Sequence, residues 1–325
     1  IVTLFSSPTF STNQLANGIL QKDFDELLLS EEKPFFNRAL RGRYPPASSI
    51  KPAIAMYGIE EGLIDWNFSI FDEGFFTLPE DGRIYRDWKE GGHGNTNLFK
   101  AITQSSNTYF FDLAYRSDIN QLKKHLSSLG FGDKACIDCF EEDQVFVPEP
   151  SWKMNKHNFG WFKGDTVNMG VGQGYLVSTP IQLAKYAYIM ANKGKFSDLS
   201  LKKDLVKSEK SIEFNKFSND DWFKLHESMV NVIEGNTGTA RRLREKKNYI
   251  VAAKTGTAEL VSGDNREQYS ETRLDDSLRD HALIIAFGPM PNPRYAVSVV
   301  VENGESGGSV AGPVAISVLN SLIQE

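Results

Sequence analysis

Cysteine is scarce in this sequence: only Cys136 and Cys139 occur among 325 residues. A single C-x-x-C pair, without a second pair, cannot complete a tetrahedral zinc site. We interpret the two residues as ordinary loop cysteines, with a redox or disulfide role as the alternative. A chain of this length with 40% hydrophobic residues has enough apolar side chains for a large core, so its folding needs no disulfide or metal framework.

The sequence also lacks long apolar runs and an excess of basic residues. No run approaches the roughly 18 apolar residues of a membrane span, and no signal-peptide pattern is present. The formal net charge of -6 and the absence of a basic patch argue against binding to nucleic acid. The chain opens on strand-like residues 1–5, which we expect to join a sheet, and an N-terminal part is expected to be missing before them.

Three short motifs carry groups suited to acyl transfer. They are S-x-x-K at Ser48 and Lys51, S-x-N at Ser105 and Asn107, and K-T-G-T at 254–257. Positions three apart share one face of a helix, so the Lys51 amine can reach the Ser48 hydroxyl. A serine nucleophile beside a basic amine needs no histidine, and the three motifs therefore predict a serine acyltransferase site.

The chemistry of this site requires a lysine that is partly uncharged near neutral pH. We expect burial and the neighbouring cation Lys254 to lower the pKa of Lys51. Ser105 is expected to relay a proton to the leaving group, and the Asn107 amide to orient the substrate. Gly256 lacks a side chain, so a peptide can lie along this strand edge, with its carboxylate bound by the flanking Thr255 and Thr257.

Hydrophobic periodicity predicts an α+β fold. Helices are expected after Ser48 and over 98–104, 108–113, 122–129, 181–191, 222–234 and 310–323, and strands over 249–253, 281–287 and 295–302. This order favours an antiparallel sheet covered by helices, with a mainly helical lobe inserted. We predict one domain over 1–325, with a helical lobe at about 50–193 and a sheet lobe at about 1–47 and 240–325.

In the order and content of these motifs, the chain resembles the penicillin-binding transpeptidases, and in particular the monofunctional class B enzymes of rod-shape elongation in Gram-negative bacteria. Further segments resemble the same enzymes over nearly the whole chain: Tyr44-Pro45-Pro46-Ala47-Ser48, Gly172-Gln173-Gly174-Tyr175, Asn236-Thr237-Gly238-Thr239-Ala240, Arg279-Asp280-His281 and Val301-Glu302-Asn303-Gly304. The resemblance implies the penicillin-binding and serine β-lactamase-like fold, with a membrane anchor and a pedestal that this chain lacks.

By this resemblance, Ser48 is acylated by a D-Ala-D-Ala stem peptide of peptidoglycan, and the amine of a neighbouring stem resolves the ester into a cross-link. Lys51 would be the base, Ser105 and Lys254 the proton relay, and the Ser48 and Thr257 amides the oxyanion hole. β-Lactams would trap Ser48. The expected partners are a membrane glycan polymerase and the elongation scaffold, and the expected location is the inner membrane with the catalytic domain in the periplasm.

The resemblance also raises the question of a metal. No cofactor is needed for catalysis. In some members of the family that the chain resembles, however, two aspartates, a histidine and a cysteine are arranged as a structural zinc site. Asp72, Asp87 and His93 match, whereas Ser106 stands in place of the thiolate and is a far poorer ligand. The alternative interpretation is a set of solvated acids with a lone histidine.

Other activities fit the same three motifs. A D,D-carboxypeptidase passes the acyl group to water, a serine β-lactamase needs an additional base for rapid deacylation, and a penicillin-responsive sensor domain acylates without turnover. Asp280 and His281 suggest a Ser-His-Asp triad, but His281 opens a predicted strand and the serine already has a lysine partner. The extent of the resemblance favours the transpeptidase.

Overall fold

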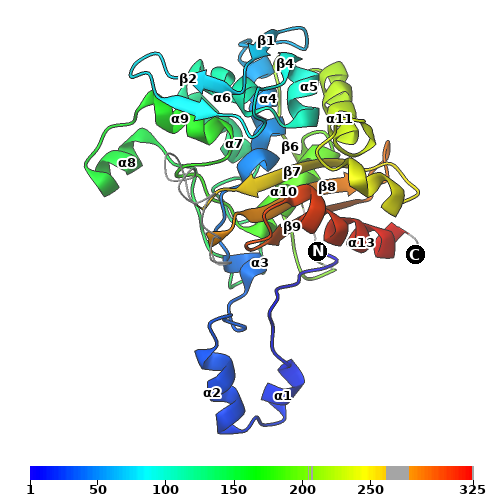
Figure 1. Cartoon of the computed structure of the whole chain (residues 1–325). Coiled ribbons are helices and arrows are strands. Elements are labelled where there is room, and N and C mark those ends of the chain that lie inside the picture. Colours follow the sequence, from blue (N-terminus) through cyan, green and yellow to red (C-terminus); the bar gives the residue numbers. More distant parts are fainter. Residues whose placement is uncertain (204, 206–207, 261–277, 324–325) are drawn as a thin grey trace.

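A computed structural model describes residues 1–203, 205, 208–260 and 278–323 (Figure 1). Its helices are α1 (Thr12–Ala16), α2 (Gln21–Leu29), α3 (Arg38–Arg41), η1 (Ala47–Ile50), α4 (Lys51–Glu60), α5 (Leu98–Gln104), α6 (Asn107–Tyr115), α7 (Ile119–Ser128), α8 (Pro150–His157), α9 (Lys163–Gly170), α10 (Pro180–Ala191), α11 (Asn219–Glu234), η2 (Arg241–Lys246), η4 (Gly307–Ala311) and α13 (Gly312–Ile323). Its strands are β1 (Ser69–Asp72), β2 (Phe75–Thr77), β3 (Ile84–Arg86), β4 (Gly94–Asn97), β5 (Lys195–Phe196), β6 (Lys210–Ser211), β7 (Ala252–Ala258), β8 (His281–Gly288) and β9 (Tyr295–Val301).

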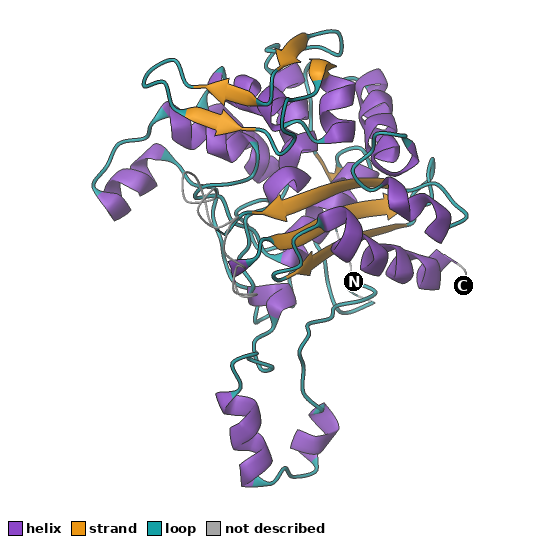
Figure 2. Ribbon diagram, in the orientation of Figure 1, coloured by secondary structure: helices purple, strands orange, loops and turns teal. Residues whose placement is uncertain are grey.

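The main sheet has three antiparallel strands in the order β7-β8-β9 (Figure 2). The central strand β8 is an almost continuous apolar run, as expected for a strand that is covered on both faces. Its side chains alternate between two cores: Leu283, Ile285 and Phe287 join one, and Ala282, Ile284 and Ala286 join the other. The same alternation fixes the register of β8 against its neighbours.

Helices cover both faces of this sheet. Leu183, Ala187 and Met190 of α10 belong to the core of one face, and Ala315 and Leu319 of α13 to the core of the other. Helix α11 contributes to both cores, because its residues near Leu225 pack in the first and those near Ile233 in the second. The sheet and the helical region are thereby joined by a shared helix.

The helical region surrounds α4, whose residues from Lys51 to Ile59 are all buried. A helix that is apolar around its whole circumference is expected at the centre of a bundle, and Lys51 is the only charged residue among these nine. Between α4 and α5 the chain forms two small antiparallel pairs, β1 with β4 and β2 with β3. This excursion carries Asp72, Asp87 and His93.

Most of the predicted elements are confirmed, with boundaries shifted by a few residues. The α+β fold class is as predicted. The division into a helical lobe and a sheet lobe stays a prediction: α10 packs in the core that joins the sheet to the helical region, and α11 was assigned to neither lobe. Within the predicted sheet lobe, residues 261–277 lie outside the described part of the chain.

The predicted strand at residues 1–5 is wrong, since residues 1–10 form no strand. A strand forms only where it can pair with the free edge of another strand. Here the main-chain nitrogen of Ile1 donates to the Ser200 carbonyl at 2.8 Å, and the Ile1 side chain packs beside Leu40 and Ile181. The chain then runs out to α1 and α2, which project from the body in Figure 1. Contacts among Phe10, Phe24 and Phe35 hold this projection together.

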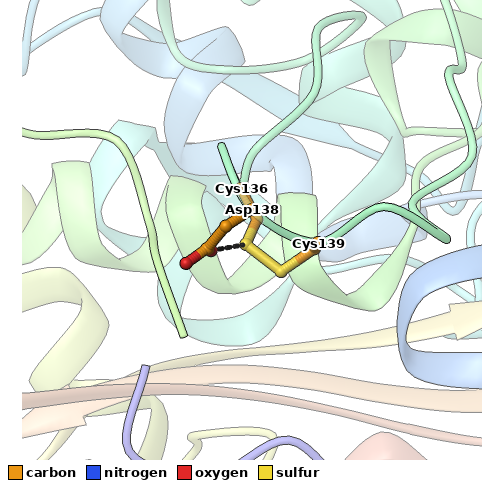
Figure 3. Close-up of side chains that lie close together, drawn as sticks. All are labelled: Cys136, Asp138 and Cys139. Carbon is orange, nitrogen blue, oxygen red and sulfur yellow. Dashed lines mark hydrogen bonds between the residues drawn. A yellow bond between two sulfur atoms is a disulfide. The ribbon is translucent and has the colours of Figure 1, made fainter. Parts of the chain in front are cut away.

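Cys136 and Cys139 form a disulfide in the loop after α7 (Figure 3), so their interpretation as ordinary loop cysteines is wrong. The spacing of two cysteines left this alternative open, but could not decide whether both thiols face each other. Between them, Asp138 accepts hydrogen bonds from Leu201 N and Lys202 N. The loop thus docks onto the segment that also holds Ile1.

In the described part of the chain, no helix is both long and apolar enough to span a bilayer.

Candidate active site

Ser48 lies in the single turn η1, directly before α4, and is half-buried. Its carbonyl accepts the Lys51 main-chain N–H, which places the two residues one turn apart. The preceding Ala47 has a φ of 49°, an unusual left-handed conformation for a residue with a side chain. Ala47 N donates to the Gly172 carbonyl at 2.8 Å, and a Cβ on Gly172 would lie 2.3 Å from the Ala47 oxygen. Gly172 therefore allows the close backbone contact that holds this turn.

The Lys51 amine is completely buried among oxygen atoms of the second motif. Its Nζ donates to Asn107 Oδ1 at 2.6 Å and to the carbonyls of Ser105 and Ser106 at 2.8 and 3.1 Å. Burial lowers the pKa of Lys51 to about 7, although the nearby Asp87 and Asp72 carboxylates act to raise it. A lysine with this pKa is partly uncharged at neutral pH and can accept a proton.

Ser105 stands at the junction of α5 and α6 in the left-handed conformation, with a φ of 60°. This conformation ends α5 and turns the Ser105 side chain toward the sheet, where Lys254 Nζ donates to its Oγ at 2.7 Å. Burial lowers the pKa of Lys254 well below its ordinary value, and the charge of Lys51 lowers it further. The structure therefore links all three motifs through one serine.

The third motif forms β7, whose one edge pairs with β8. In an antiparallel pair, alternate residues direct both backbone groups away from the partner. Gln173 Nε2 donates to the Thr257 carbonyl at 3.2 Å from outside the sheet, which identifies Thr257 and Thr255 as the outward residues. Gly256 lies between them, where a Cβ would meet Ser49 N and the Pro46 carbonyl at 3.3 Å. The edge of β7 thus lies directly beside the turn of the nucleophile.

The two threonines differ in their freedom to bind a ligand. The Thr255 hydroxyl lies 2.7 Å from the Thr239 hydroxyl, and Thr255 is buried. Thr257 is half-buried and its side chain is the more accessible of the two. The outward N–H of Thr257 and the N–H groups of the nucleophile's turn are the groups suited to stabilise an oxyanion.

Asp72, Asp87, His93 and Ser106 form a buried cluster behind the second motif. Asp72 Oδ2 lies 2.7 Å from His93 Nδ1 and accepts from Ser106 Oγ at 2.7 Å. Burial raises the pKa of Asp72, but these hydrogen bonds outweigh it and hold the pKa well below its usual range. Asp87 Oδ2 accepts from the first two N–H groups of α6, Asn107 N and Thr108 N. The interpretation of these acids as solvated is therefore wrong.

The donor set does not fit a structural zinc ion. Such sites are four-coordinate and draw on thiolate or imidazole ligands, and here the fourth position is a hydroxyl. Ser106 Oγ donates to Asp72 and accepts from Tyr109 N as the N-cap of α6, so its proton and one of its two lone pairs are already engaged. Within the described residues, His93 Nε2 is buried and has no hydrogen-bond partner. The Asp72 and Asp87 carboxylates instead lie 2.7 and 3.8 Å from His93 Nδ1, so a metal held by this set would bind Nδ1.

Several site residues were not predicted from the sequence. The Trp88 indole N–H donates to the Ser105 carbonyl at 3.1 Å, and Asp87 caps α6. Both lie in a loop without periodicity, so no spacing signalled these contacts, and Asp87 was expected only as a candidate zinc ligand. Gln173 was noticed only as part of a resembling segment. His281 is no part of a triad with the nucleophile in this geometry, because its Nδ1 accepts from Asn303 N and its ring packs against Tyr44.

Ser48 lies one turn before a buried lysine of lowered pKa, a second lysine is bonded to Ser105, and one edge of β7 pairs with no strand among the described residues. This arrangement defines a serine acyltransferase site. The family model "Penicillin binding protein transpeptidase domain" matches residues 1–320. The chain belongs to this family.

Curated relatives share the same architecture over almost the whole chain. "Peptidoglycan D,D-transpeptidase MrdA" of Acinetobacter baumannii is 39% identical over 320 residues, which cover 96% of this chain and 47% of the relative. The protein of the same name from Escherichia coli K12 is 34% identical, covering 99% of this chain and 52% of the relative. The chain spans about half the length of the curated relatives it matches.

Solved structures agree with this assignment. Pseudomonas aeruginosa PBP2 in complex with WCK 5153 superimposes with a TM-score of 0.87 at 35% identity, covering 99% of this chain and 70% of the other. The complex between penicillin-binding protein 2 and MreC from Helicobacter pylori gives a TM-score of 0.85 at 30% identity, covering 98% of this chain and 57% of the other.

Proposed function

We propose that this chain is the catalytic part of a peptidoglycan D,D-transpeptidase that cross-links stem peptides through an acyl-enzyme on Ser48. The observation that carries the proposal is the position of Lys51, which is completely buried, has a pKa lowered to about 7 and lies one turn after Ser48. The curated relatives named D,D-transpeptidases support the same reaction.

The proposed reaction has two steps. Neutral Lys51 takes the Ser48 proton, and Ser48 Oγ attacks the carbonyl between the two terminal D-alanines, with the oxyanion held by the Ser48 and Thr257 N–H groups. Ser105 relays a proton to the amine of the leaving D-alanine, and the Ser105 Oγ accepts a hydrogen bond from Lys254 Nζ. The amine of a second stem then attacks the ester, loses a proton and restores the Ser48 hydroxyl.

Substrate would be held along β7. The stem peptide adds to the outward edge at Thr255 and Thr257, beside Gly256, and Asn107 orients its amide. The terminal carboxylate would lie near Thr257, the more accessible hydroxyl. β-Lactams would acylate Ser48 in the same way and leave a stable ester.

We also propose the cellular setting from the relatives. The complete protein would be anchored in the inner membrane with this domain in the periplasm, and would work with a membrane glycan polymerase and the elongation scaffold in maintaining cell shape. Two solved structures support such partners. One is the complex of Helicobacter pylori PBP2 with MreC, and the other is a peptidoglycan synthase complex whose matching chain is 25% identical to this one. We propose further that hydrogen bonds, without zinc, hold the Asp72 cluster together.

Mass spectrometry after exposure to a β-lactam tests the nucleophile. A single adduct on Ser48, lost in Ser48→Ala, is expected, and an adduct elsewhere would overturn the assignment. Release of D-alanine from a pentapeptide, measured with and without an acceptor amine, separates the activities. Cross-linked product indicates a transpeptidase, hydrolysis alone a carboxypeptidase, rapid loss of the adduct a β-lactamase, and labelling without D-alanine release a sensor.

A further inference from the structure

Four aromatic rings gather at the surface around α8, and no role described above uses them. Trp152 is at the centre, with ring-centroid distances of 5.0 Å to Phe146, 5.4 Å to His157 and 5.3 Å to Tyr175. His157 stacks on Tyr175 at 5.4 Å. We call these four residues the α8 aromatic surface.

This surface is not part of the hydrophobic core. Within the described residues, none of the four rings belongs to the buried clusters that hold the helices and the sheet together. Phe146 is 45% exposed, Tyr175 is 38% exposed and His157 is also exposed. Aromatic rings that pack on one another at the surface, rather than in the core, are typical of a binding site.

The chain connects one ring of the surface to the proposed substrate edge. Tyr175 follows Gln173 by two residues, and Gln173 donates to the Thr257 carbonyl at the open edge of β7. The Lys153 amine lies 5.5 Å from the centre of the Tyr175 ring, and its 2.5 Å ion pair with Asp165 holds this amine beside the ring. The α8 aromatic surface therefore includes a ring that lies two residues along the chain from a side chain contacting the edge of β7.

The chemistry of the surface fits sugar rings. The C–H face of a hexose packs on an aromatic ring, while the indole N–H, the phenol and the imidazole can bond to hydroxyl and acetamido groups. Lys156 lies 5.3 Å above the Trp152 ring and adds a positive charge at the same place. Exposed apolar side chains at Met154, Phe159 and Phe162 lie on or next to α8, so the test below includes lipid vesicles as the competing occupant.

We propose that the α8 aromatic surface binds the glycan strand of peptidoglycan, as an N-acetylated β-1,4-linked hexose polymer, next to the stem peptide in the active site. This inference rests on the proposed function, because it names where the polymer that carries the substrate peptide is held. The surface would keep the enzyme on the strand between successive cross-links.

The test uses glycan strands from which the stem peptides have been removed, so that the active site is not needed for binding. Isothermal titration of the wild-type protein is compared with Trp152→Ala and with His157→Ala, whose exposed ring can be removed without opening the core. We expect Trp152→Ala to weaken binding about tenfold or more and His157→Ala about threefold. Thermal unfolding of each variant confirms that it is folded.

Phe223→Ala is the matched control. Phe223 is an aromatic residue on α11 with 61% exposure, and α11 lies on the opposite side of the molecule from α8 in Figure 1. Its loss is expected to leave glycan affinity unchanged. No glycan binding by the wild type, or equal binding by wild type and Trp152→Ala, would overturn the proposal.

Two further arms separate the alternatives. If anionic vesicles bind the wild type and not Trp152→Ala, while glycan binds neither, the surface belongs to a membrane contact and the proposal is wrong. Acylation of Ser48 by a β-lactam is measured separately on the wild type. If the β-lactam does not acylate Ser48, the proposed function is wrong. Binding of the peptide-free glycan does not depend on acylation and is measured separately.

Discussion

Lys254 Nζ donates a 2.7 Å hydrogen bond to Ser105 Oγ, across 149 residues of sequence. This bond joins the sheet to the junction of two helices, and Lys51 donates to the carbonyl of the same serine. The two buried lysines therefore share one partner, and the charge on Lys51 disfavours a charge on Lys254.

A first prediction concerns the pH dependence of acylation. The pKa of Lys51 is about 7, so below pH 7 the amine is protonated and cannot accept the Ser48 proton. The second-order rate of acylation by a β-lactam should rise about tenfold per pH unit below pH 7 and level off above it. Stopped-flow measurements between pH 5.5 and 9 check this, and a flat profile would contradict the role of Lys51 as the base.

The second concerns the pair of Ser105 and Lys254. Ser105→Ala and Lys254→Met should each slow acylation by about 10²- to 10⁴-fold, and the double variant should be little slower than either one, because the two residues act as a unit. Ser228→Ala is the control, since Ser228 is a buried serine whose hydroxyl donates to the Leu225 carbonyl of its own helix. Additive losses would show that the two residues act separately.

The third concerns metal content. Purified protein should contain less than stoichiometric zinc by mass spectrometry, and Ser106→Cys should take up about one zinc ion by supplying the missing thiolate beside Asp72, Asp87 and His93. Ser117→Cys, a buried serine at the end of α6, should gain none. Stoichiometric zinc in the wild type would show that the hydroxyl suffices.

The fourth concerns stability at the nucleophile's turn. Gly172→Ala should lower the free energy of unfolding by about 3 kcal/mol or more, because a φ of 73° combines with a Cβ 2.3 Å from the Ala47 oxygen. Gly82 has a φ of 72° with open space around it, so Gly82→Ala should cost only about 1 kcal/mol. Urea unfolding measures both. Equal losses would mean that the close contact with Ala47 is unimportant.

The sequence predicted those parts of the fold that depend on local pattern. The apolar run of β8 and the helical periodicity of α5 and α10 are sufficient to predict these three elements. The order of the three motifs indicated that the motifs meet in one site. Residues 1–5 have strand propensity, yet propensity does not supply a neighbouring strand, and the prediction failed there.

Features that depend on long-range contacts could not be predicted. The burial of Asp87 depends on the N-terminus of α6, which needs acceptors, and this need becomes visible only once the loop of β1 to β4 is folded against it. The hydrogen bond from Trp88 to Ser105 and the disulfide of Cys136 with Cys139 likewise depend on which atoms meet in space.

The outward edge of β7 has a consequence for solubility. An unpaired strand is a template on which a second copy of a protein can assemble. Here the outward carbonyls of Thr255 and Thr257 already accept hydrogen bonds from Lys254 and Gln173. A foreign strand gains less from pairing with such an edge, so these two side chains protect the chain against self-association. Among the described residues, the outward N–H groups of Thr255 and Thr257 are left for an incoming peptide.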